Sequence, residues 1–136
     1  MDHDESLREI LLSAKTIASV GLSSNQAKES FWIASYLKEQ GYRVIPVNPP
    51  ADEILCEKAY PDLQAVPEKI DVVQVFRKPE DVPPVVDGAI NVGAKVVWMQ
   101  EGIVNEAAAQ SARAAGLQVV MDACMREMHQ RLIAAG

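Results

Sequence analysis

The sequence contains few of the residues on which metal sites and disulfides depend. Its 136 residues include two histidines and two cysteines. Neither histidine has a second metal-ligand residue at helical or loop spacing, which argues against a histidine-rich metal site. Cys56 and Cys124 lie far apart without CxxC spacing, which indicates free thiols in a reducing compartment.

Basic charge and long apolar runs are also scarce. There are 13 basic against 19 acidic residues, a formal net charge of −6, and this balance disfavours a nucleic-acid partner. No stretch approaches the roughly 18 apolar residues of a membrane span. The acidic start from Met1 to Arg8 does not resemble a secretory signal. We therefore expect a cytoplasmic protein without a membrane partner, forming one domain over residues 1–136.

Short apolar runs recur along the chain, separated by segments with helical spacing. The runs predict strands at Thr16–Val20, Arg43–Val47, Asp71–Val75, Val96–Met99 and Gln118–Met121. Continuous rather than alternating apolar strands are typical of a parallel sheet covered on both faces. We predict an α/β, Rossmann-like, doubly wound parallel five-stranded sheet, with strand order 3-2-1-4-5 and helices on both faces. Ala51 to Lys69 is expected to be mostly irregular.

In such a sheet the ligand binds outside the carboxyl ends of the strands, which directs attention to the loops there. The loop after the first strand begins Gly21-Leu22-Ser23-Ser24 and offers backbone N–H groups and hydroxyls that suit a phosphate. It lacks the GxGxxG and P-loop patterns, and an ordinary βα turn with a serine cap is the alternative interpretation.

Three further loop features bear on the ligand. Asn48-Pro49 follows the second strand, where an NAD-binding unit usually has Asp or Glu. Lys28, Arg77 and Lys78 are cations that one anionic ligand can share, and a solvated surface charge is the alternative interpretation of each. Cys124 precedes a predicted helix, where it is either a thiol of lowered pKa or a small buried hydrophobic residue. No Ser-His-Asp set, Cys-His pair or carboxylate pair stands out, so no catalytic residue is predicted.

Taken together, several segments resemble a known family. They are KTIASVGLS (15–23), GYRVIPVNP (41–49), DVVQVFRKPEDVP (71–83), GAKVVWMQEGI (93–103) and GLQVVMDAC (116–124). The chain resembles the small stand-alone CoA-binding proteins, whose domain is similar to the CoA-binding domain of the succinyl-CoA synthetase α subunit. The resemblance implies that coenzyme A or an acyl-CoA lies across the strand ends.

The resemblance also implies roles for individual residues. It places the diphosphate over Gly21, Ser23 and Ser24, and the adenosine beside Asn48 and Pro49. Lys28, Phe76 and Arg77 are implied contacts of the phosphates and the nucleotide. Gln100 and Gly102 are implied to approach the pantetheine arm. Cys124 lies at the same ligand-binding edge.

The chain departs from the family pattern at two cations. Ala123 stands where the family commonly has Arg or Lys, and Pro50-Ala51-Asp52 stands where the synthetase subunits tend to carry a lysine. Both departures bear on recognition of the 3′-phosphate. The phosphorylatable histidine of the larger enzymes has no counterpart here, so their ligase activity is not implied.

The sequence thus predicts a module that binds CoA or an acyl-CoA and has no reaction of its own. Two alternatives remain: an NAD(P)-binding regulatory domain or small oxidoreductase, and the CoA-binding subunit of a ligase with a separate catalytic chain. A homo-oligomer or a ligase partner is compatible with the first prediction.

Overall fold

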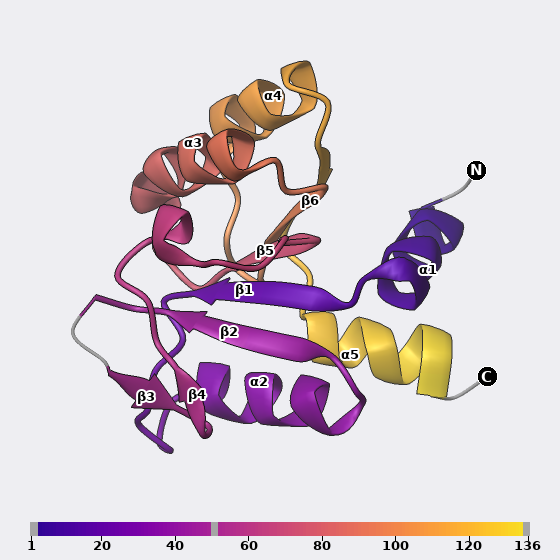
Figure 1. Ribbon diagram of the computed structural model, residues 1–136. Coiled ribbons are helices and arrows are strands. Elements are labelled where there is room, and N and C mark those ends of the chain that lie inside the picture. Colours follow the sequence, from indigo (N-terminus) through magenta and orange to yellow (C-terminus); the bar gives the residue numbers. More distant parts are fainter. Residues whose placement is uncertain (1–2, 50–51, 135–136) are drawn as a thin grey trace.

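The computed structural model describes residues 3–49 and 52–134 (Figure 1). Its main sheet has five strands that all pair in parallel. They are β1 (Thr16–Val20), β2 (Arg43–Val47), β5 (Val72–Val75), β6 (Val96–Met99) and β7 (Gln118–Val120). The predicted strands and their parallel pairing are confirmed. A small antiparallel hairpin, β3 (Glu53–Ile54) with β4 (Glu57–Lys58), lies apart from this sheet.

The strand order in the main sheet is β2-β1-β5-β6-β7. Counted along the chain, this reads 2-1-3-4-5. The predicted α/β fold with a parallel five-stranded sheet is confirmed. Outside β2, where the expected order has a third strand, a parallel bridge joins Val47 to Tyr60, and β5 lies between β1 and β6. The carbonyl of Pro46 accepts the Tyr60 N–H at 3.0 Å on this outer side, so the N–H that proline lacks costs no hydrogen bond to β1.

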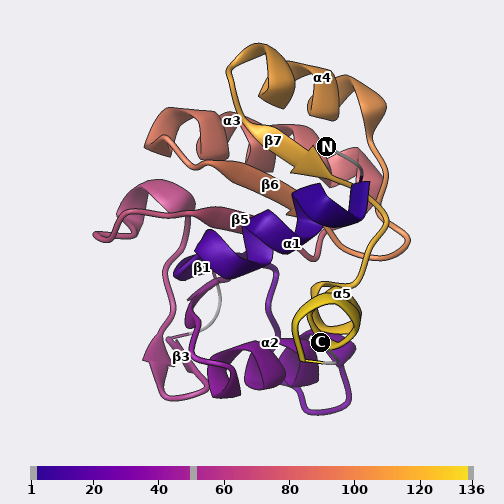
Figure 2. The ribbon, with the colours of Figure 1, turned by 90° about the vertical axis from the view of Figure 1, so that its right-hand side faces the viewer.

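Helices cover both faces of the sheet, as a doubly wound fold requires (Figures 1 and 2). On one face lie α3 (Val82–Val92) and α4 (Glu106–Ala114), preceded by the 3-10 turns Leu63–Ala65 and Pro79–Asp81. On the other face lie α1 (His3–Ser13), α2 (Glu29–Glu39) and α5 (Met125–His129), which continues as a π-helical turn over Gln130–Ala134. None of these helices is long and apolar enough to cross a bilayer.

Each face has its own apolar core. Val86, Ala89 and Ala112 pack with strand residues on the side of α3 and α4. Leu11, Leu37 and Trp98 belong to the core on the side of α1, α2 and α5. Because both faces are buried, the carboxyl ends of the strands are the part of the sheet left open to a ligand.

Asp71 joins the amino ends of β1 and β5. Its carboxylate accepts the backbone N–H groups of Lys15 and Thr16 at 2.9 and 3.0 Å. Burial alone would raise the pKa of Asp71, but these two hydrogen bonds and nearby Lys95 together hold that pKa below its usual value. The carboxylate thus fixes the start of β1 beside β5.

Candidate functional site

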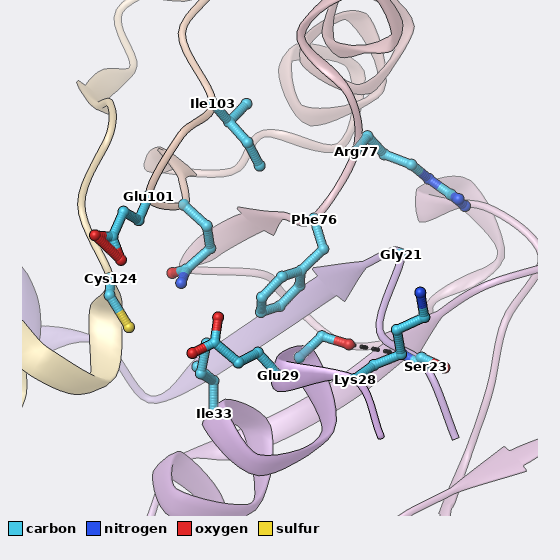
Figure 3. Close-up of a pocket in the computed structure, with 12 residues that line it drawn as sticks. Gly21, Ser23, Lys28, Glu29, Ile33, Phe76, Arg77, Glu101, Ile103 and Cys124 are labelled. Carbon is cyan, nitrogen blue, oxygen red and sulfur yellow. Dashed lines mark hydrogen bonds between the residues drawn. The ribbon is translucent and has the colours of Figure 1, made fainter. Parts of the chain in front are cut away.

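An open cavity of about 400 Å³ lies at the carboxyl ends of β1, β5 and β6 (Figure 3). Its wall comes from the loop after β1, the first turns of α2, the residues that follow β5 and β6, and the residue before α5. The lining residues are Gly21, Ser23, Lys28, Glu29, Ser30, Ile33, Phe76, Arg77, Gln100, Glu101, Ile103 and Cys124.

Gly21 lets the first loop turn tightly against the end of β5. Its φ is +90°, and a Cβ added there would lie 2.6 Å from the carbonyl oxygen of Phe76. A larger residue would therefore force the two loops apart. The Gly21 N–H donates to the Val47 carbonyl at 2.9 Å, which anchors the turn to β2.

The loop then continues into α2 through hydrogen bonds of its own. The Ser23 N–H donates to Ser30 Oγ at 3.1 Å, and the Asn25 N–H donates to Ser23 Oγ at 3.0 Å. Lys28 occupies the N-cap of α2 and makes no side-chain capping hydrogen bond. The N–H groups of the first turn of a helix lack intrahelical partners and carry a partial positive charge. This end of the cavity therefore suits an anion.

Two cationic side chains add to that preference. Lys28 is exposed, Arg77 is half-buried, and both line the cavity. Within residues 3–49 and 52–134, neither side chain forms a hydrogen bond or an ion pair. Both charges are consequently available to a phosphate.

A buried polar chain crosses the sheet below the cavity. Ser19 Oγ donates to Gln74 Oε1, and Gln74 Nε2 donates to Gln100 Oε1 at 3.1 Å. The Met125 N–H, in the first turn of α5, donates to the same oxygen at 3.1 Å. Gln100, which is 3% exposed, is thereby held in one orientation at the cavity wall.

The predicted binding residues divide into two groups. Gly21, Ser23, Lys28, Phe76, Arg77, Gln100 and Cys124 all line the cavity. Pro49 lines a second cavity, of about 550 Å³, which Arg77 also borders. Arg77 therefore borders both cavities.

The other three predicted residues lie outside both linings. Asn48 Nδ2 donates to the Leu22 carbonyl at 2.9 Å, so this side chain braces the first loop. The Gly102 N–H donates to Asp122 Oδ1 at 2.6 Å, which ties together the loops after β6 and β7. Ser24 is exposed.

The sequence analysis did not single out Glu29, Ser30, Ile33, Glu101 or Ile103 as lining residues. Three of them come from the first turns of α2. Ser30 and Ile33 are three residues apart and share a helix face, and both are buried. Their spacing in the sequence indicated a shared buried face of the helix. Only the folded loop after β1 shows that this face of α2 lines the cavity.

The described part of the chain has no group of three His, Cys, Asp or Glu side chains that could hold a metal ion. Cys124 is 4% exposed and belongs to the core that includes Met125. His129 is remote from the cavity wall and bonds to Tyr36 through Nδ1 at 2.8 Å. The cavity thus offers binding groups, without a paired nucleophile and base.

Residues 15–130 match the model of a protein family described as the CoA binding domain. The chain belongs to this CoA-binding domain family. The family expected from the sequence is therefore confirmed.

Three relatives illustrate the match. YneT of Bacillus subtilis (strain 168) is 40% identical over 123 residues, which span 90% of this chain and 91% of that protein. The solved structure of a protein from Pyrococcus horikoshii OT3 has a TM-score of 0.94 and 43% identity, over 97% of this chain and 93% of that one. An ADP-forming acetate–CoA ligase of Archaeoglobus fulgidus is 33% identical over 87 residues, which are 62% of this chain but 13% of the ligase.

Proposed function

We propose that this protein binds coenzyme A or an acyl-CoA at the carboxyl ends of its parallel strands and catalyses no reaction of its own. One observation carries the proposal. A cavity at these strand ends combines a glycine turn, a helix N-terminus and two cations that form no ion pair with the described residues. These features suit a diphosphate, and family membership supplies the chemical identity of its owner.

In this proposal the ligand extends through both cavities. The diphosphate lies over Gly21 and Ser23, between Lys28 and Arg77. The adenosine enters the second cavity beside Pro49, and the pantetheine arm runs past Phe76 toward Gln100 and Cys124. This path is supported by the position of Arg77, which borders both cavities, because CoA is too extended for one compact pocket.

The NAD(P) alternative is less well supported. An NAD-binding unit uses a carboxylate at the end of its second strand to bind the ribose hydroxyls. Here that position holds Asn48, whose side-chain amide is engaged by the Leu22 carbonyl.

The ligase-subunit alternative rests on the similarity to the acetate–CoA ligase, of which this chain matches 13%. A separate catalytic chain would have to supply the remainder. Co-purification of such a chain with this protein would favour that alternative over the stand-alone module.

Mass spectrometry of ligand released from the purified protein, followed by calorimetry with CoA and NAD, tests the proposal. We expect CoA or an acyl-CoA in the released fraction and tighter binding of CoA than of NAD. Tighter binding of NAD would refute the assignment. Light scattering of the same sample would show whether the binding unit is a monomer or a homo-oligomer.

A further inference from the structure

The cavity presents a hydrogen-bond donor that the protein itself does not use. Gln100 is 3% exposed and lines the cavity. Its Oε1 already accepts from the Met125 backbone N–H and from Gln74 Nε2. A flipped amide would place two donors against the Met125 N–H, so the orientation is fixed. Among the described residues, no acceptor receives the Gln100 Nε2 group.

No buried side-chain nitrogen or oxygen of the described residues lacks a hydrogen-bond partner, so the Gln100 Nε2 group is open to the cavity and can donate to an acceptor on a ligand. The oxygen of an amide or a thioester carbonyl is such an acceptor, whereas a thiol sulfur is a weak one. The Gln100 amide therefore favours a ligand with a carbonyl oxygen at this point of the cavity.

The charges that line the cavity are separated between its two ends. In Figure 3 the head groups of Lys28 and Arg77 lie toward one side, and the carboxylates of Glu29 and Glu101 lie toward the other, where Cys124 is. A diphosphate drawn to the cations therefore directs the far end of the pantetheine arm toward the carboxylates.

The acidic end has a net negative charge when the neighbouring cation is counted. Glu101 has no ion pair or hydrogen bond within the described part of the chain. Glu29 lies 3.9 Å from Arg126 and its side chain is 84% exposed, so solvent screens both that pair and the charge of Glu29, and Glu101 is the unpaired carboxylate. Ile33, Ile103 and Cys124 add apolar side chains to the cavity lining.

We infer that the end of the cavity formed by Gln100, Glu29 and Glu101 selects CoA thioesters of neutral acyl groups and disfavours acyl groups that end in a carboxylate. This inference rests on the proposed function. A neutral acyl thioester supplies a carbonyl acceptor and places apolar atoms against Ile33 and Ile103. A malonyl or succinyl group adds a negative charge beside two carboxylates, where like charges repel.

Calorimetry of the full chain with CoA, acetyl-CoA and malonyl-CoA at low salt tests the inference. We expect acetyl-CoA to bind at least as tightly as CoA, and malonyl-CoA to bind about tenfold or more weakly than acetyl-CoA. Glu101→Gln should reduce the difference in affinity between acetyl-CoA and malonyl-CoA, because it removes one negative charge that repels the malonyl carboxylate and keeps the shape of the side chain. Glu9→Gln makes the same change of net charge on α1 and should leave this difference unchanged.

Gln100→Glu tests the donor separately. It retains an oxygen for the Met125 N–H and replaces the free amide. CoA and acetyl-CoA should both lose affinity, because both carry the amide carbonyls of the pantetheine arm, and acetyl-CoA should lose more only if its thioester carbonyl is the acceptor. A thermal melt of the variant checks that the fold persists, and Glu101→Gln provides the independent test if it does not.

The outcomes separate the two proposals. If CoA binds but malonyl-CoA binds as tightly as acetyl-CoA, or if Glu101→Gln leaves this difference unchanged, the inference is overturned and the proposed function stands. If CoA, acetyl-CoA and malonyl-CoA all fail to bind, the proposed function fails and the inference fails with it.

Discussion

Replacing Arg77 by alanine removes the charge that both cavities share. Because the Arg77 side chain forms no hydrogen bond or ion pair with the described residues, its loss leaves no protein group unpaired. Any change in CoA affinity therefore reports on the ligand contact itself. A hydrogen bond between charged groups contributes roughly 1.5–3 kcal/mol. Arg77→Ala should thus weaken CoA binding about ten- to a hundredfold.

Calorimetry at two salt concentrations measures this loss. It should be larger at low salt, because salt screens half-exposed charges. Arg113→Ala is a matched control, since Arg113 is an exposed arginine of α4 that pairs with Glu106 at 3.3 Å. Dephospho-CoA keeps the diphosphate and should lose as much affinity as CoA, whereas pantetheine has no phosphate and should lose none. Binding of CoA by Arg77→Ala within about twofold of wild type, or an equal loss with pantetheine, would refute the phosphate contact.

Four further predictions concern the fold and the ligand. Gly21→Ala should lower the free energy of unfolding in urea by more than Gly41→Ala does, because a Cβ at Gly21 meets the Phe76 carbonyl at 2.6 Å while Gly41, also at positive φ, has open space. Asp71→Ala should lower the free energy of unfolding by about 1–3 kcal/mol at pH 7. Because the pKa of Asp71 is lowered in the folded protein, the wild type loses this stabilisation as the pH falls below about 4. Urea unfolding should therefore give the wild type and the variant similar free energies of unfolding at low pH. Cys124→Ser should leave CoA affinity within about tenfold, and loss of a measurable turnover in this variant would contradict the non-enzymatic proposal. Dephospho-CoA should bind within about tenfold of CoA, because the second cavity holds Asp62, Asp81 and Asp87 against the single cation Arg77; a hundredfold preference for CoA in calorimetry would contradict this.

Strands β1, β2, β5 and β6 were predictable because their largely apolar runs are almost entirely buried. In β7 only Val120 is buried. The hairpin β3–β4 was not predictable, since its strands have two residues each. Its turn places Leu55 and Cys56 at φ of 53° and 64°, without the Asn or Gly that usually marks such a turn. Pro46 was a signal that β2 lies near the edge of the sheet, because proline in a strand favours that position. On the outer side of β2 the structure has a parallel bridge from Val47 to Tyr60.

The candidate site was predictable where a residue directly follows a strand, as Gly21, Phe76 and Gln100 do. It was less so where a side chain reaches the cavity from a helix, as Ile33 does from α2. Asn48 shows the opposite case. It follows a strand directly, yet it turns back to the Leu22 carbonyl, because the loop after β1 needs a donor there. Position at a strand end therefore predicts proximity to the site, and tertiary hydrogen bonds decide which side chains are free to bind.

Site residues whose polar groups or backbone are already required by the fold are weaker evidence for a ligand than groups that have no partner in the protein. Gly21 is required by its contact with Phe76 whether or not a phosphate binds, so its presence is explained by folding alone. Ser30 Oγ likewise accepts the Ser23 backbone N–H within the loop. The charges of Lys28 and Arg77 and the Gln100 Nε2 group have no partner among the described residues, although Gln100 Oε1 accepts from Gln74 and Met125. These unsatisfied groups, more than the glycine turn, favour an extended ligand with phosphates at one end and a carbonyl oxygen further along.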